Sequence, residues 1–191
     1  QQALLLRKGL KGIVYCHSKP LCEELAQALD CAYYHAGQVD RAEWLQEWHR
    51  QGGLIIATSA LGTGLDFPKV VYILHVEMPW SMVDYAQESG RGGRAGERVE
   101  SMILVEHGQV EQTIKQKSDD LDVQAMGVFL LGTGCRRGLM SSYLDGKWVG
   151  CHDIQSAGCD RCGEGVDAAL AYQQEASQEW QWVEELMDEM Q

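Results

Sequence analysis

Short apolar runs alternate with helical segments over the first hundred residues, and this alternation restricts the fold more than any other feature. Leu54 to Thr58 and Val70 to Leu74 are apolar at nearly every position, which is typical of strands covered on both faces. Shorter runs at Ile13 to Cys16, Ala32 to Tyr34 and Ser101 to Val105 extend the pattern. Strands separated by helices predict an α/β fold, a parallel sheet with helices packed against it.

The segments between the runs carry helix signals. Ser18 is placed to cap a helix and Pro20 fits its first turn. The apolar face of that helix is expected to consist of Leu21, Leu25, Ala28 and Leu29. Asp40 and Glu43 resemble a capping box that opens a second helix. The buried side of the second helix is expected to carry Trp44, Leu45 and Trp48.

The net charge of −12 is distributed unevenly. Residues 163–191 contain eight acidic residues and no Lys or Arg, so residues 1–162 carry only −4. Residues 166–191 are expected to form one amphipathic helix with an acidic face. No apolar run is long enough to cross a bilayer, and the N-terminus lacks the features of a signal peptide. The sequence therefore predicts no membrane partner, and the absence of an initiator Met suggests a piece of a longer chain.

The stretch from Gln87 to Gly96 places two arginines, Arg91 and Arg94, among four glycines. An arginine in such a turn can present its planar fork to a transferring γ-phosphoryl group. Alternatives are a flexible basic loop and a dinucleotide-binding fingerprint. The fingerprint must follow a strand and open a helix, whereas these glycines follow a predicted helix.

This stretch resembles motif VI of superfamily 2 helicases, specifically the RecQ family's Q-E-x-G-R-A-G-R-D-G. Three earlier segments resemble RecQ motifs in the same order: Tyr15 to Lys19 (motif IV), Tyr34 to Gly37, and Ile56 to Pro68 (motif V). The resemblance runs from about Gly12 to Cys162 and implies a RecA-like motor lobe in residues 1–106. The sequence departs from the family at two positions, with Gly92 where Ala is usual and Ala95 where Asp is usual.

The resemblance also implies roles for individual residues. Arg94 would be the arginine finger that reaches an ATP γ-phosphate, Arg91 would assist it, and Gln87 would bridge to the motor interface. Gly64 and Asp66 would couple the nucleotide state to DNA, with Asp66 accepting a hydrogen bond near the ribose or motif VI. The residues expected to hold the single-stranded DNA backbone are Ser18, Lys19, His35, Gly37 and Thr58. Taken alone, His35 also fits a half-buried polar residue beside Tyr34, and Ser18 a helix cap.

Four late cysteines, Cys135, Cys151, Cys159 and Cys162, include one C-x-x-C pair and suit a closed tetrahedral zinc site. Cys135-Arg136-Arg137 resembles the start of the RecQ zinc-binding subdomain, which implies a helical appendage over residues 107–165. The gap before Cys159 is longer than in the family, so His152 is an alternative ligand to Cys151. Free buried thiols and a redox pair are the competing interpretations.

The sequence lacks the nucleotide cradle that a motor needs. Its one Gly-Lys pair, Gly146-Lys147, precedes Trp148, and its one Asp-Glu pair, Asp188-Glu189, lies in the acidic tail. The chain is therefore expected to be the C-terminal part of a RecQ-like ATP-dependent 3′-to-5′ DNA helicase, inactive alone. ATP and Mg²⁺ would bind only together with the missing first lobe.

The partners implied by the resemblance are single-stranded or forked DNA and that first RecA-like lobe. The implied setting is DNA repair and recombination in the nucleus, or in the nucleoid and cytoplasm of a prokaryote. A rival interpretation is a non-catalytic nucleic-acid- or protein-binding module from a degraded helicase gene. A zinc hydrolase is excluded because four cysteine ligands leave no open coordination position.

The six tryptophans raise the question of base stacking. Trp44, Trp48, Trp180 and Trp182 lie on predicted helices, where core packing is the simpler interpretation. Trp80 lies in the loop before motif VI and is the candidate worth testing.

Overall fold

The computed structural model describes residues 9–62, 66–94 and 96–162. Its contacts divide the chain into two compact units. The first comprises the described residues of Gln1–Pro79 and Asp84–Glu106, and the second those of Trp80–Val83 and His107–Gln191. The predicted acidic helix at 166–191 lies outside the described residues.

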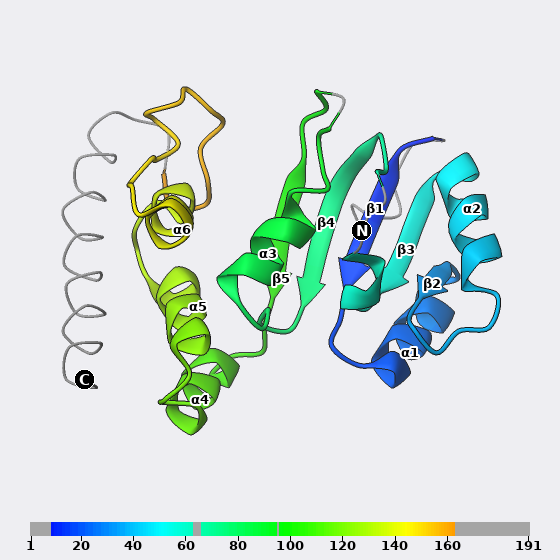
Figure 1. The fold of residues 1–191 in the computed structure, drawn as a ribbon, viewed down its shortest axis with the longest axis horizontal. Helices are drawn as coiled ribbons and strands as arrows, with labels where there is room; N and C mark the ends of the chain where they lie inside the picture. The colour runs from blue at the N-terminus through cyan, green and yellow to red at the C-terminus, as the bar shows by residue number, and fades with distance from the viewer. Residues whose placement is uncertain (1–8, 63–65, 95, 163–191) are drawn as a thin grey trace. The chain divides into compact units, whose positions relative to one another are not determined.

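A five-stranded sheet forms the first unit (Figure 1). Its strands are β1 (Lys11–Tyr15), β2 (Ala32–Tyr34), β3 (Gly53–Ala57), β4 (Val70–Val76) and β5 (Glu100–Leu104). Every neighbouring pair is parallel, in the order β2-β3-β1-β4-β5. In the centre, Ile13 pairs with Ile55 on one side and with Ile73 on the other. The predicted parallel α/β sheet is confirmed, and all five strands lie within two residues of their expected bounds.

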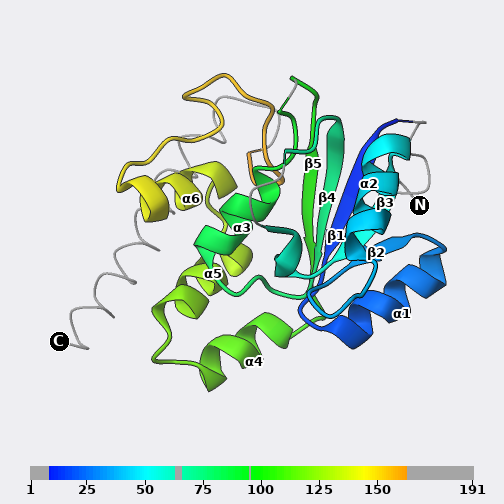
Figure 2. The same cartoon turned by 45° about the vertical axis from the view of Figure 1, so that its right-hand side comes forward.

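Helices cover both faces of this sheet (Figures 1 and 2). One face, with Ile13, Ile55 and Ile73, packs against Leu45 and Trp48 of α2 (Arg41–Gln51). The opposite face carries Val14, Cys16 and Ile56, which pack against Cys22 and Ala26 of α1 (Lys19–Leu29). Because side chains alternate along a strand, each central strand serves both cores, which explains why its sequence is apolar throughout.

The expected helix faces are only partly correct. Helix α1 buries Cys22 and Ala26, while Leu29, predicted to face the core, is exposed. In α2 the Asp40 side chain makes no capping hydrogen bond, although its carbonyl accepts from the Glu43 and Trp44 N–H groups. Trp44 is exposed, because Leu45 and Trp48 alone fill the core beneath the helix.

The second unit is helical and contains α4 (Gln109–Gln116), α5 (Leu121–Leu131) and α6 (Arg136–Asp145). Gly127 on α5 lets α4 approach closely, since a Cβ there would lie 2.6 Å from Ile114 Cγ2. Gly138 on α6 likewise leaves room for the Trp148 ring. Among the described residues, no helix is long and apolar enough to span a membrane.

Candidate functional site

The predicted site residues of the first unit lie at two opposite edges of the sheet. Asp66 precedes β4 and Arg94 precedes β5, so both lie at the amino edge. The expected DNA-contacting residues follow the carboxyl ends of three strands: Ser18 and Lys19 follow β1, His35 and Gly37 follow β2, and Thr58 follows β3. Parallel strands bring their carboxyl ends to one edge, so the fold groups these residues although they are scattered in sequence.

At the amino edge, Arg94 Nη1 donates to Asp66 Oδ1 over 2.9 Å. The contact joins motifs V and VI, as one of the two predicted roles of Asp66 requires. The turn that carries Arg94 is fixed by Gly93, whose N–H donates to the Val70 carbonyl and whose φ is +71°. Both ion-pair partners are exposed to solvent, with 44% of the Arg94 side chain accessible. Gly64 and Ala95 lie outside the described residues.

Arg91, by contrast, is buried among polar groups that the sequence analysis did not identify. Its guanidinium lies beside the Tyr15 hydroxyl, and burial raises the pKa of Tyr15. The Tyr15 ring stacks on His75, whose centroid is 5.2 Å away. His75 Nε2 lies 2.9 Å from a carboxylate oxygen of Glu88, in the last turn of α3 (Met82–Ser89).

These contacts attach the C-terminal end of α3 to β1 and β4. His75 is 4% exposed and Glu88 12%, so their hydrogen bond is shielded from water. Gln87, the neighbour of Glu88, points outward and is exposed. The buried side of α3 therefore holds the motif while Gln87 remains accessible. No sequence signal distinguished His75 from an ordinary residue of a buried strand.

Gly92 stands where the family has Ala, and in this chain the Val99 side chain occupies the space that an alanine methyl group would need. A Cβ at position 92 would lie 2.5 Å from Val99 Cγ1, and Val99 packs against the main core. Gly92→Ala is expected to cost about 1–3 kcal/mol of stability through overpacking. Val99→Ala, added to it, should recover much of that loss. Urea unfolding of both single variants and the double variant measures this coupling, and strictly additive effects would contradict it.

At the carboxyl edge, Ser18 caps α1: its Oγ accepts from the Leu21 N–H over 3.3 Å. The predicted cap is confirmed, and Pro20 lies in the first turn. Lys19 extends toward the loop after β2, where its Nζ would be 3.1 Å from a Cβ at Gly37. Because Gly37 has no side chain, the Lys19 ammonium fits beside its backbone.

His35 is buried, and both of its ring nitrogens have partners within the chain. Nδ1 accepts the Gly37 N–H over 3.1 Å, so Nε2 carries the proton and donates to Glu23 over 2.9 Å. This geometry suits a residue that shapes the loop around Gly37. Glu23, which orients His35, was missed by the sequence analysis. Thr58 donates its N–H to the Tyr34 carbonyl and ties this loop to β3.

A second missed residue, Glu77, supports the loop after β1. Its carboxylate accepts the His17 N–H over 3.2 Å and lies 3.6 Å from the His17 ring. Glu77 has a φ of +86°, a conformation that non-glycine residues rarely adopt. This backbone conformation points the Glu77 carboxylate toward His17, the residue before Ser18.

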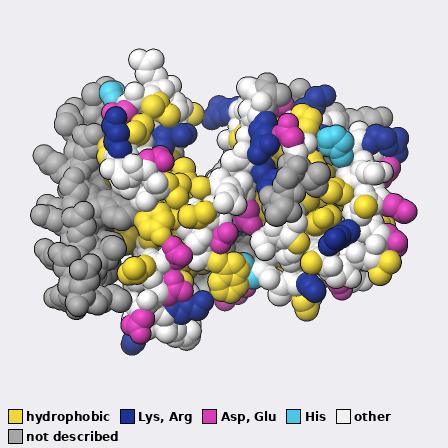
Figure 3. Space-filling view, viewed as in Figure 1, with side chains coloured by type: hydrophobic (Ala, Val, Ile, Leu, Met, Phe, Trp, Pro, Cys, Tyr) yellow, Lys and Arg dark blue, Asp and Glu magenta, His cyan; other side chains and the backbone are white. Residues whose placement is uncertain are grey.

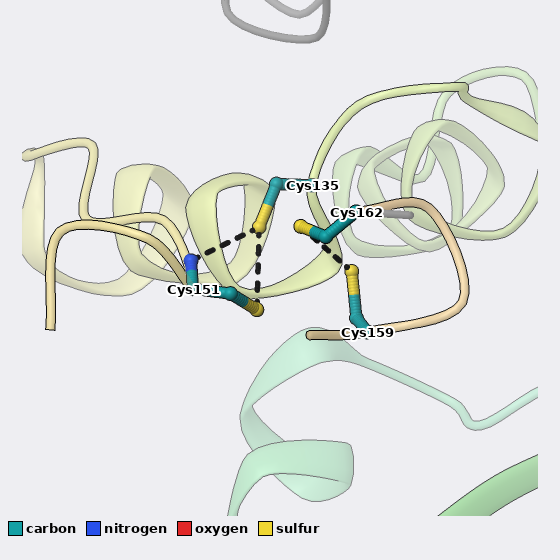
Figure 4. A group of neighbouring side chains, drawn as sticks. All are labelled: Cys135, Cys151, Cys159 and Cys162. Atoms are coloured by element: carbon teal, nitrogen blue, oxygen red, sulfur yellow. Dashed lines mark hydrogen bonds between the residues drawn. The ribbon is translucent and has the colours of Figure 1, made fainter. Parts of the chain in front are cut away.

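In the second unit, the four late cysteines converge (Figure 4). Their sulfur atoms all lie within 4.8 Å of one another. A tetrahedral zinc ion with bonds of about 2.3 Å needs sulfurs about 3.8 Å apart, which this spacing matches. Cys151 belongs to the cluster, whereas His152 is exposed and outside it. All seven cysteines are free thiols.

Backbone N–H groups point at these sulfurs. The Cys151 N–H donates to Cys135 Sγ, and the Arg136 N–H donates to Cys159 Sγ. The Cys135 thiol and the N–H groups of Arg136 and Arg161 lower the pKa of Cys159 to about 4, against the opposing effect of burial. Thiolates are the form that binds metal, and these N–H groups stabilise negative charge on the sulfurs.

The Arg136 side chain ties the cluster to the helices. It makes a bidentate ion pair with Asp160, at 3.0 and 2.9 Å, and hydrogen-bonds the Phe129 carbonyl. Asp160 lies inside the C-x-x-C pair, so this contact fixes the loop that presents Cys159 and Cys162. Arg136 therefore has a structural role, whereas the neighbouring Arg137 is exposed.

Comparison with known proteins places these sites in a family. The helicase conserved C-terminal domain matches residues 1–96. The ATP-dependent helicase SGS1 of Saccharomyces cerevisiae is 33% identical over 178 residues, which cover 81% of this chain and 12% of SGS1. The ATP-dependent DNA helicase RecQ of Pasteurella multocida is 28% identical over 187 residues, covering 88% of this chain and 28% of RecQ. The chain thus spans well under a third of these relatives.

Among solved structures, the DEAD-box protein SrmB of E. coli, bound to the regulator of ribonuclease activity A, has a TM-score of 0.48 and 26% identity. That similarity covers 57% of this chain and 69% of SrmB. The family match covers half of the chain and includes motifs IV, V and VI as far as Gly96. The chain therefore belongs to the helicase conserved C-terminal domain family, and its curated relatives place it among the RecQ-type helicases.

Proposed function

We propose that this chain is the second motor lobe and zinc-binding subdomain of a RecQ-like ATP-dependent DNA helicase. In this proposal residues 1–106 form the lobe, residues 107–165 the zinc-binding subdomain and residues 166–191 an acidic helix. The observation that carries it is the arrangement of motif VI, with Arg91 buried beside Tyr15 and Arg94 exposed after the turn at Gly93.

Arg94 is the arginine finger of this proposal. Its ion pair with Asp66 is exposed, and such pairs contribute about 1 kcal/mol or less. A γ-phosphate in a dry interface offers a stronger, bidentate partner. Once a lobe with bound ATP faces this edge, it is therefore favourable for Arg94 to leave Asp66 and pair with the γ-phosphate. Arg91 and Gln87 support the same contact, Arg91 from within the fold and Gln87 at the surface.

The carboxyl edge is the proposed DNA track. Hydroxyl groups, such as those of Ser18 and Thr58, and the Lys19 ammonium suit contacts to phosphates, which carry no sequence information. His35 and Gly37 contribute by shaping the loop beside Lys19. On the face seen in Figure 3, basic and acidic side chains are interspersed over the described residues. Binding by this chain alone is therefore expected to be weak and salt-sensitive.

Motif V connects the two edges in this proposal. It runs from Ile56 to Pro68, with Thr58 after the carboxyl end of β3 and Asp66 before the amino end of β4. Leu61 and Phe67 anchor this segment in the core. In this proposal a shift of Asp66 when Arg94 changes partner is transmitted toward Thr58, and Gly64, which lies outside the described residues, takes part in this coupling.

Zn²⁺ is the proposed occupant of the cysteine cluster, with Cys135, Cys151, Cys159 and Cys162 as ligands and a structural role. ATP and Mg²⁺ bind only when the first lobe is present. Relatives named as DNA helicases support DNA as the partner. The proposal further includes single-stranded or forked DNA as its form, 3′-to-5′ polarity, and a role in repair or recombination in the nucleus or, in a prokaryote, the nucleoid or cytoplasm, as the RecQ resemblance implies.

The chain alone is expected to show no ATP hydrolysis above the spontaneous rate, because it lacks a phosphate loop. Joined to a lobe that carries Gly-Lys-Ser/Thr, it should hydrolyse ATP in a DNA-stimulated manner. A phosphate-release assay with and without an oligonucleotide measures both. A joined protein that binds DNA and ATP yet never hydrolyses ATP would favour the non-catalytic module.

A further inference from the structure

Trp80 is an aromatic residue that the proposed function has not used. It lies four residues after Val76, the last residue of β4. A chain of four residues spans at most about 14 Å, so Trp80 stays near the carboxyl end of β4 in any arrangement of the two units. The proposed DNA-contacting residues follow the carboxyl ends of β1, β2 and β3. Trp80 extends this series to the fourth strand.

The backbone on both sides of Trp80 is anchored, yet its ring is held in solvent. Met78 and Met82, two residues before and two after, are buried, while Trp80 is 53% exposed. An apolar side chain of this size normally loses exposed area by packing. Here the anchored neighbours present the indole at the surface.

A cation accompanies this exposed ring. Lys117 Nζ lies 4.8 Å from the ring centroid, and both residues belong to the second unit. The backbone of Lys117 is fixed: its N–H donates to the Thr113 carbonyl, and its carbonyl accepts from Gln124 Nε2 over 3.0 Å. The nearby carboxylates have structural partners, since Asp120 caps α5 and Asp119 accepts from Ser118. An aromatic face and an ammonium on a fixed backbone therefore lie together.

We propose that Trp80 and Lys117 form a binding site for one unpaired nucleotide of single-stranded nucleic acid. The base stacks on the indole, and the ammonium pairs with the flanking phosphate. An exposed cation–π contact is weaker than a base–aromatic stack, so a base can take the ring while Lys117 swings to the phosphate. Stacking accepts every base, so the site adds affinity without sequence preference. The inference rests on the proposed DNA track and extends it.

The test compares two apolar replacements in the 191-residue chain. Trp80→Leu keeps apolar bulk but removes the π face, whereas Trp80→Phe keeps an aromatic face. Affinity for an oligothymidylate at low salt is measured by fluorescence anisotropy of a labelled strand. Trp80→Leu should bind roughly 5- to 150-fold more weakly, while Trp80→Phe should stay within about threefold of the unaltered chain.

An abasic strand of equal length separates stacking from charge. Trp80→Leu should leave its affinity for that strand unchanged. Lys117→Ala should weaken binding of both strands, with Lys115→Ala on the same helix as its matched control. Trp44→Leu is the control for the indole, since Trp44 is 49% exposed on α2.

Three results would overturn the inference. Trp80→Leu could match Trp44→Leu on oligothymidylate, or it could lose as much affinity for the abasic strand. Trp80→Phe could also bind as weakly as Trp80→Leu, which would make the indole a packing residue. These results would leave the proposed DNA track standing. An unaltered chain that binds neither strand at low salt overturns the track and this site together.

Discussion

Arg94→Ala is expected to lower ATP hydrolysis by at least about a thousandfold when the chain is joined to an ATP-binding lobe. An arginine finger stabilises the charge on the transferring phosphoryl group, and its loss typically costs 10³-fold or more. The structure makes the prediction specific, because Arg94 is exposed and its ion-pair partner, Asp66, is an exposed carboxylate. Steady-state phosphate release under saturating ATP and DNA measures the effect.

Two further variants isolate the role of the guanidinium. Arg98→Ala removes a cation four residues along the same loop and should leave turnover within a fewfold of normal. Arg94→Lys keeps the charge but loses the planar fork, so it should restore only a small part of the rate. Normal turnover in Arg94→Ala would eliminate the arginine-finger role, whatever the controls show.

Removing metal from the cysteine cluster is expected to unfold the part of the second unit around α6 and leave the sheet intact. Structural zinc supplies about 10 kcal/mol or more of folding free energy in small domains. Elemental analysis should find about one zinc per chain. After chelation, amide hydrogen exchange should lose protection in Arg136–Asp145 but keep it in β1, β3 and β4. A metal-free protein with full protection of α6 would contradict the structural role.

Single substitutions identify the fourth ligand of that site. Cys151→Ser should reduce the bound zinc and destabilise α6, because the Cys151 sulfur lies in the cluster. His152→Ala should do neither, because its side chain is exposed outside the cluster. Cys31→Ser, at a half-buried cysteine of the first unit, controls for general effects of removing a thiol.

The sheet was predictable because its strands are nearly continuous apolar runs, and parallel strands covered on both faces need such sequences. The helix faces were less predictable. In α1 the small residues Cys22 and Ala26, rather than Leu29, meet the sheet. Helix periodicity identifies an apolar stripe but not the rotation that brings the helix closest to a sheet, where small side chains are favoured.

The candidate sites show the same contrast between residues that the sequence predicts and residues that it does not. Motif order and cysteine spacing identified Arg94, Asp66 and the cysteine cluster, because their residue types are unusual in such patterns. The polar groups that support α3 and the loops at the carboxyl edge were missed. His75, Glu23 and Glu77 act through partners 12 to 60 residues away in sequence. Their positions follow from strand order, which no local pattern encodes.

The separation of the two edges has a mechanical consequence. Five residues of β1 measure about 16 Å, so Arg94 and the loops proposed to contact DNA are about one strand length apart and cannot touch. Any force between them passes through densely packed isoleucines with little compressibility. Loosening that packed interior, for example by Ile55→Ala, should weaken the mechanical coupling between the two edges. ATP would then still be hydrolysed, but less of the movement would reach the loops proposed to contact DNA.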